Sequence, residues 1–120
     1  MINFSQVASK TLAGCALMAN RTKVSTEIVI TEHPEFVTIT AFDFACSTQG
    51  EYAVCELAEY PNKYYPCGMS ITNICRNWIE SYQGDIEQAN KDLKTSGGCR
   101  VKLERVRTGK GNQFVRVTVL

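Results

Sequence analysis

Long apolar runs, histidines and glycine-rich loops are scarce in this sequence. No apolar stretch approaches the roughly 20 residues that cross a bilayer, and the start of the chain lacks a basic signal-peptide region. The single histidine, His33, precedes a proline. The run Gly109-Lys110-Gly111 lacks the strand-to-helix context of a phosphate-binding loop. These absences predict a cytoplasmic, non-catalytic protein with no membrane partner and no cofactor.

A zinc site is the first interpretation of the six cysteines, but they contain no Cys-x-x-Cys pair, the spacing that zinc sites commonly use. A disulfide framework is a second interpretation, although such scaffolds are usually shorter and rich in loops. The third is that the thiols are small buried hydrophobic groups in a reducing compartment. Cys46 and Cys55 lie in strand-like segments and Cys75 lies on the apolar side of a helix-like segment, which favours this third interpretation.

Acidic residues are nearly absent from the last quarter of the chain. Residues 94–120 carry seven of the thirteen Lys and Arg residues but only one acid, Glu104, which gives a charge of +6. Residues 1–93 carry six bases and eleven acids, a charge of −5. A cationic segment on a chain of net charge +1 predicts a polyanionic partner.

Alternating apolar residues predict three strands after residue 36. In the first, Val37, Ile39 and Ala41 are expected on one face, and Phe42 and Phe44 on the other. The second spans residues 51–60 and places Ala53, Cys55 and Leu57 on one face. The third spans residues 64–69, after a predicted turn at residues 61–63, and its proline indicates an edge position.

The pattern changes to helical spacing at Ser70. Ile71, Ile74, Cys75, Trp78, Ile79 and Tyr82 form one apolar stripe, with Ser70 as a candidate N-cap and Gly84 as a stop. Asp85 and Gln88 resemble the capping box of a second short helix. The last two segments, around Val101 and Val117, predict a hairpin whose turn covers Arg107–Asn112.

The predicted order is three strands, a helical region and two strands. This order predicts a mainly β, α+β fold: a five-stranded OB-like Greek-key barrel with its helix between strands 3 and 4. Residues 1–120 form one domain in this interpretation, and residues 1–35 are an N-terminal extension without firm assignment. Phe4, Val7, Leu12 and Leu17 are candidates to dock the extension on the domain, and residues 25–30 fit either a helical turn or a strand.

Binding of single-stranded nucleic acid needs bases that follow the phosphates and aromatic rings that stack on the nucleobases. The candidate bases are Lys63, Arg100, Lys102, Arg105, Arg107, Lys110 and Arg116. The candidate stacking residues are Phe42, Phe44, Tyr52, Tyr64 and Phe114, with Tyr60 and Tyr65 as further ones. Two alternatives stay open: Phe42 and Phe44 could form a small core under residues 1–30, and the bases could simply form a solvated strand edge.

Three segments carry a family resemblance: Val37–Phe44, the helix Ile71–Tyr82 and the hairpin Val101–Leu120. They span about two thirds of the chain, and their order and residue types resemble small OB-fold single-stranded-DNA-binding proteins of bacteriophages and mobile elements. The resemblance implies a role in DNA replication or recombination inside a bacterial host, with single-stranded DNA as the partner and RNA as the alternative. The glycine-rich region and acidic tail of the housekeeping bacterial proteins have no counterpart here.

The extension could also serve as a contact in a homo-oligomer. Two other functions remain open at this point. The first is a protein-interaction module, such as a phage-encoded inhibitor or accessory factor that binds an acidic host protein. The second is a virion structural protein. Glu51, Glu56 and Glu59 could form a carboxylate cluster or a hydrated strand edge.

Overall fold

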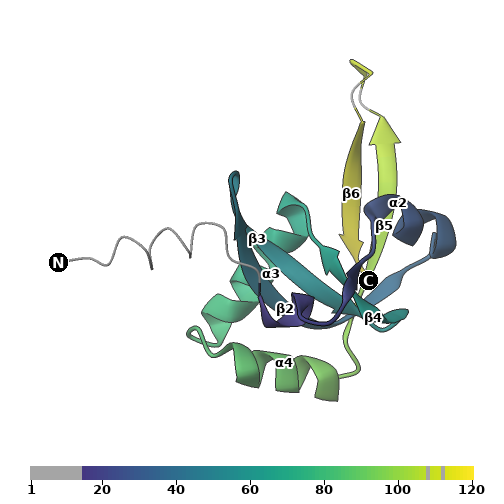
Figure 1. Cartoon of the computed structure of the whole chain (residues 1–120). Coiled ribbons are helices and arrows are strands. Elements are labelled where there is room, and N and C mark those ends of the chain that lie inside the picture. Colours follow the sequence, from purple (N-terminus) through teal and green to yellow (C-terminus); the bar gives the residue numbers. More distant parts are fainter. Residues whose placement is uncertain (1–14, 108, 112) are drawn as a thin grey trace.

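A six-stranded mixed sheet forms the centre of the computed structural model, which describes residues 15–107, 109–111 and 113–120 (Figure 1). The strand order is β1-β4-β3-β2-β5-β6. The strands are β1 (Thr22–Lys23), β2 (Val37–Ser47), β3 (Gly50–Leu57), β4 (Tyr60–Pro66), β5 (Cys99–Arg107) and β6 (Gln113–Val119). The helices are α2 (Thr26–Glu32), α3 (Met69–Ser81), α4 (Ile86–Thr95) and the short 3-10 helix η1 (Ala16–Met18). The chain is a compact α+β domain.

A bulge in β2 changes which of its side chains face the core. Ile39 pairs with Leu57 of β3 and Ala41 pairs with Glu56, so Thr40 has no partner of its own in β3. One extra residue reverses the alternation of side chains beyond that point. Phe42 therefore lies on the same core side as Ile39, and the predicted placement of Phe42 and Phe44 opposite Val37 and Ile39 is wrong.

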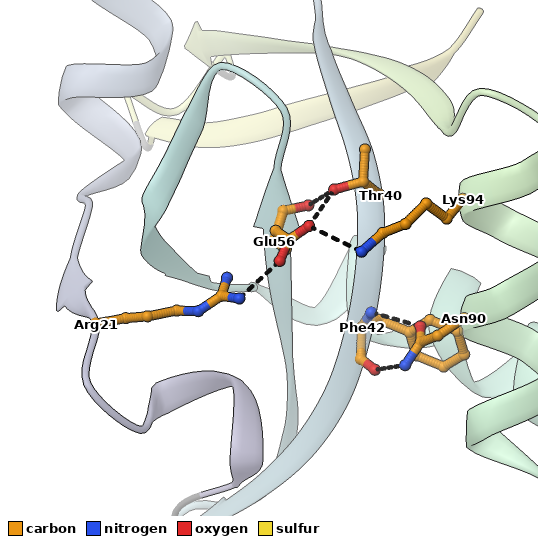
Figure 2. Close-up of polar contacts among 6 residues, drawn as sticks. All are labelled: Arg21, Thr40, Phe42, Glu56, Asn90 and Lys94. Carbon is orange, nitrogen blue, oxygen red and sulfur yellow. Dashed lines mark hydrogen bonds and ion pairs between the residues drawn. The ribbon is translucent and has the colours of Figure 1, made fainter.

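Helix α4 provides hydrogen-bond partners for backbone groups of β2 beyond the end of its pairing with β5. The side-chain amide of Asn90 accepts a hydrogen bond from the Phe42 N–H and donates one to the Phe42 carbonyl, both at 2.9 Å (Figure 2). Beyond Ile39, β2 is no longer paired with β5. One side chain thus takes the place of a neighbouring strand at this position.

The turn between β2 and β3 lies between Ser47 and Gly50, and the turn that follows β3 is not at the predicted place. Leu57 pairs with Tyr60, so the second turn is Ala58-Glu59, and the predicted turn at residues 61–63 lies inside β4. Residues between Tyr60 and Tyr65 leave β3, and Lys63 and Tyr64 pair with β1 instead. Pro61 contributes no N–H to a ladder, which fits this departure.

Residues 21–33 of the predicted extension are part of the domain. Val24 and Val29 are 1% and 0% exposed and belong to the main core cluster. Ser25 caps α2 by accepting a hydrogen bond from the Ile28 N–H, which settles the helix-or-strand alternative for this segment in favour of a helix. The proposed docking residues Phe4, Val7 and Leu12 lie outside the described residues.

The helical region follows the predicted pattern with small changes at its boundaries. Helix α3 begins after Gly68 rather than Ser70, and Gly84, at φ 89°, donates its N–H to the Ile79 carbonyl as a C-terminal stop. Asp85 caps α4 and accepts from the Gln88 N–H at 3.2 Å, but the Gln88 side chain donates to Asp92, so only this half of the predicted capping box forms. No helix among the described residues is long and apolar enough to span a membrane.

The sheet does not form a closed barrel within the described residues. Strand β2 pairs with β3 and β5, β3 pairs with β4, and β5 pairs with β6, but no pairing joins β4 to β6. The side chain of Thr26 in α2 is bonded to the Tyr65 hydroxyl at 2.9 Å, and α2 also contacts β5. Helix α2 therefore lies on the open side of the sheet and helps to cover its core.

Candidate nucleic-acid interface

The β5–β6 hairpin carries most of the predicted basic residues, and its distal half stands clear of the rest of the molecule (Figure 1). Val101 and Leu103 are buried and face Val119 and Val117, as the alternation predicts. The neighbouring positions form the opposite face of the hairpin. That face carries Arg100, Lys102, Glu104, Val106, Phe114, Arg116 and Thr118.

Several of these bases have partners within the chain. Glu104, the single acid of the segment, lies 3.1 Å from the Arg116 guanidinium and 3.7 Å from the Lys102 ammonium. The Arg100 guanidinium lies 4.8 Å from the centre of the Phe36 ring, a cation–π contact. These groups remain cationic, but their exposed pairings with Glu104 are weak and a phosphate can compete for them.

Arg105 points away from that face and pairs with Glu27 of α2. Arg105 lies on the same face of the hairpin as Leu103, but further along the strand than this last core residue. Arg105 therefore ties the hairpin to α2 and is a weaker candidate for nucleic-acid contact than the sequence suggested. The sequence gives no signal for this pairing, because 78 positions separate the two residues.

The distal end of the hairpin combines free charge with an exposed aromatic ring. Arg107 and Lys110 are exposed and make no ion pair with any other described residue. The Phe114 side chain, which pairs across the hairpin with Val106, is 47% exposed. Two predicted turn residues, Thr108 and Asn112, lie outside the described residues. This end thus offers a ring for stacking and two bases for phosphate contact, with the Arg107 side chain leaving the strand on the same face as Arg105, opposite to Phe114.

The prediction that Phe42 stacks on a nucleobase is wrong. Its side chain is 1% exposed and packs edge-to-face against Phe44 and Trp78, at centroid distances of 6.0 and 5.5 Å. Phe44 is half-buried against the same core cluster. The bulge at Thr40 is the physical reason for both placements. The alternative that Phe42 is a core residue is therefore right, but Phe42 belongs to the main core and not to a separate small one.

The remaining residues predicted to contact nucleic acid lie on β3 and β4, away from the hairpin. Tyr52 and Tyr64 are half-buried residues of β3 and β4, and Lys63 is half-buried where β4 pairs with β1. Helix η1 contacts β2, β3 and β4. Burial raises the pKa of Tyr52, and the charge of the Cys15 thiolate adds to this effect. The structure thus covers part of this face with residues of its own N-terminal segment.

A group of ionic contacts around Glu56 fastens that segment to the sheet (Figure 2). The Glu56 carboxylate accepts from the Arg21 guanidinium at 2.7 Å and from the Thr40 hydroxyl at 2.8 Å, and Lys94 lies 3.8 Å away. Burial alone would raise the pKa of Glu56, but the hydrogen bonds from Arg21 and Thr40 and the charge of Lys94 outweigh it and lower the pKa. The carboxylate stays ionised at neutral pH.

The three glutamates considered as a cluster have separate partners. Glu51 pairs with Arg76 at 3.7 Å, and Glu59 accepts from the Thr38 N–H at 2.8 Å. Glu56 has the partners described above. These carboxylates therefore serve as structural acceptors along β3 and in the turn that follows it.

All six cysteines are free thiols. Cys55, Cys67 and Cys75 are buried together, with Sγ–Sγ distances of 3.3 Å for Cys55–Cys67 and 3.9 Å for Cys55–Cys75. The hydrogen bond with the Cys55 thiol and burial both raise the pKa of Cys75, which keeps this thiol protonated. Within the described residues, no group of three or more His, Cys, Asp or Glu side chains has an arrangement that could hold a metal ion.

Comparisons with protein-family models, with curated proteins and with solved structures found no match for this chain. The candidate interface therefore depends on the hairpin geometry described here.

Proposed function

We propose that this chain binds single-stranded nucleic acid, with single-stranded DNA as the partner, and that it does so without catalysis through the β5–β6 hairpin. The observation that carries the proposal is the distal hairpin: exposed Arg107 and Lys110 lie in the same projecting element as exposed Phe114. Between residues 99 and 119, six bases stand against one acid, a local charge of +5. Such charge attracts phosphates without regard to sequence.

The strand connections support an open variant of the OB fold. In this proposal, β2, β3, β4, β5 and β6 take the places of strands 1 to 5 of that barrel, and the described residues make no closing contact between strands 3 and 5. Helices α3 and α4 lie between the third and fourth of these strands. In the OB fold, the loop that joins strands 4 and 5 contributes to oligonucleotide binding, and here that loop is the basic end of the hairpin.

The partly covered face of β3 and β4 favours the hairpin over the usual OB strand face as the main contact. Phosphates would contact Lys102, Arg107, Lys110 and Arg116, and a nucleobase would stack on Phe114. The biological setting that this activity fits is strand protection during the replication or recombination of phage or mobile-element DNA in a bacterial cytoplasm.

A charge-reversal experiment tests this assignment. We expect Arg107→Glu with Lys110→Glu to weaken binding of a fluorescent oligo-dT by at least about tenfold, because two phosphate contacts become repulsive. The matched control is Lys23→Glu with Lys91→Glu, which makes the same charge change at exposed sites on β1 and α4.

The control should weaken binding by less than about threefold, through long-range charge alone. Equal losses in the two double variants would contradict the assignment of the hairpin as the interface. Comparing oligo-dU with oligo-rU in the same titration decides between DNA and RNA as the preferred strand, because these two differ only in the 2′-hydroxyl.

A further inference from the structure

One edge of the sheet is covered and the other is bare. At the β4 edge, Lys63 and Tyr64 pair with β1, and the Val24 N–H donates to the Tyr64 carbonyl at 3.0 Å. At the other edge, β6 pairs only with β5 among the described residues. Five of the seven residues of β6 are exposed. The bare edge therefore offers backbone groups that another strand can pair with.

The hydrogen-bonding pattern identifies the groups that face outward. The Leu120 N–H donates to the Arg100 carbonyl at 3.0 Å, so Leu120, Thr118, Arg116 and Phe114 direct their backbone groups toward β5. The alternate residues direct their N–H and C=O groups away from β5. These are Gln113, Val115, Val117 and Val119.

The usual protection of an edge strand is missing from β6. Exposed edges commonly carry lysines, prolines or bulges, but the register of β6 with β5 is continuous and the strand holds one charged residue, Arg116. That guanidinium is bonded to Glu104 on β5. Instead, the strand exposes apolar side chains: Phe114 at 47% and Val119 at 54%, followed by Leu120 at 63%.

We propose that β6 pairs antiparallel with β6 of a second copy of this chain, with Val117 opposite the partner's Val117. In this register Val115 lies opposite the partner's Val119, and Phe114 lies opposite the partner's Leu120. Each exposed apolar residue of the strand thus meets another, which is the arrangement that stabilises cross-strand pairs. Arg116 lies opposite the partner's Thr118.

The two neighbouring symmetric registers are less favourable. With Thr118 on the two-fold axis, the charged Arg116 would face the partner's apolar Leu120. If Arg116 lay on the two-fold axis, it would face the partner's Arg116, and like charges directly opposite each other are destabilising. Phe114 would then face Thr118 of the partner. The side-chain pattern of β6 therefore selects the register centred on Val117 and favours a second copy over an unrelated strand.

A cleft of about 380 Å³ borders this edge, lined by Phe114, Val115 and Val117 of the hairpin, by Thr26 of α2 and by Tyr65, Met69 and Ile71. Helix α3 also contacts β6. The Met69 side chain is 66% exposed at this cleft and would gain apolar contacts in the dimer. The two-fold axis would also set the basic hairpin ends pointing in opposite directions.

Sedimentation equilibrium on the nucleic-acid-free protein tests the pairing, over about 1 to 500 µM because an interface of this small size is weak. We expect a monomer–dimer equilibrium. Val119→Lys should weaken it at least about tenfold, because it places a charge opposite the partner's Val115. Val119→Pro should do the same through a lost outward N–H while leaving the bonds to β5 intact. The matched control, Ile28→Lys, makes an equivalent change at an exposed apolar site on α2 and should leave the dimer unchanged.

A wild-type chain that is monomeric throughout this range would overturn the proposal, as would a dimer that both Val119 variants leave intact. Circular dichroism verifies that each variant is folded. A benzophenone side chain at position 114 tests the register independently: a photo-crosslink to the partner's Leu120 supports it, and crosslinks confined to other segments contradict it. These outcomes do not depend on nucleic-acid binding, so the two proposals can fail separately.

Discussion

On the outer face of β2, β3 and β4, polar groups are bonded to other parts of the same chain. At the end of the β5–β6 hairpin, by contrast, Arg107 and Lys110 have no ionic partner among the described residues. Glu56 fastens Arg21 and Lys94 to the first region (Figure 2). The second region stands away from the domain and exposes Phe114 (Figure 1). The contrast indicates that the covered face stabilises the domain and that the free hairpin is the surface available to a polyanion.

Truncating one phenylalanine to alanine in each region tests this contrast most sharply. Phe42→Ala should lower the free energy of unfolding by about 3–5 kcal/mol, because it leaves a cavity beside Trp78. Phe114→Ala should change stability by less than about 0.5 kcal/mol but weaken oligo-dT binding by about 1–3 kcal/mol through the lost stack. Urea denaturation and fluorescence titration measure the two quantities. A loss of binding without loss of stability in Phe42→Ala would reverse the assignment.

Removing the Glu56 charge tests the covered face. Glu56→Gln should cost about 1–3 kcal/mol of stability at pH 7, because the partly buried Arg21 loses its counter-charge. The lowered pKa of Glu56 means that its contribution is present above its ordinary value of 4.5 and is lost as the pH falls through the lower value of the folded state. The difference between wild type and variant in urea denaturation should therefore shrink toward pH 3.

Glu87→Gln, at an exposed position on α4, is the control for this variant and should behave like wild type. Oligo-dT binding should be unchanged in both variants. A large loss of binding in Glu56→Gln would show that the covered face takes part in recognition after all.

The smallest expected effect concerns the Asn90 amide, which takes the place of a β5 partner beside Phe42. Asn90→Ala should cost about 1–2 kcal/mol of stability, because the N–H and carbonyl of Phe42 lose their partners. Asn77→Ala, at an exposed site on α3, is the matched control and should cost less than about 0.5 kcal/mol. Equal stability of the two variants in urea would mean that the Phe42 backbone does not depend on the amide.

The elements with local signals could be predicted from the sequence, and those set by distant contacts could not. The stripe from Ile71 to Tyr82 and the Asp85 cap predicted α3 and α4, and alternation predicted the hairpin that carries Arg107 and Phe114. The bulge at Thr40 has no such local signal, and neither has the bond between Phe42 and the Asn90 amide, which are 48 positions apart. Period-two alternation cannot reveal an inserted residue, so the stacking role predicted for Phe42 failed.

The short helix α2 shows the same limit. Its Ser25 cap is visible in the sequence, but seven residues are too few for a helical period to be distinguished from a strand. Its role on the open side of the sheet depends on Thr26 meeting Tyr65, a contact across 39 positions. The five-stranded barrel predicted from the strand order did not include a helix at this position.

The salt dependence of oligo-dT binding tests the central claim most directly. If Lys102, Arg107, Lys110 and Arg116 contact phosphates, the logarithm of the association constant should fall against the logarithm of salt concentration with a slope of about −2 to −3. In the Arg107→Glu and Lys110→Glu double variant the slope should become shallower by about 1.4. No detectable binding at low salt, or a wild-type slope that the double variant leaves unchanged, would contradict the assignment of the hairpin as a nucleic-acid interface.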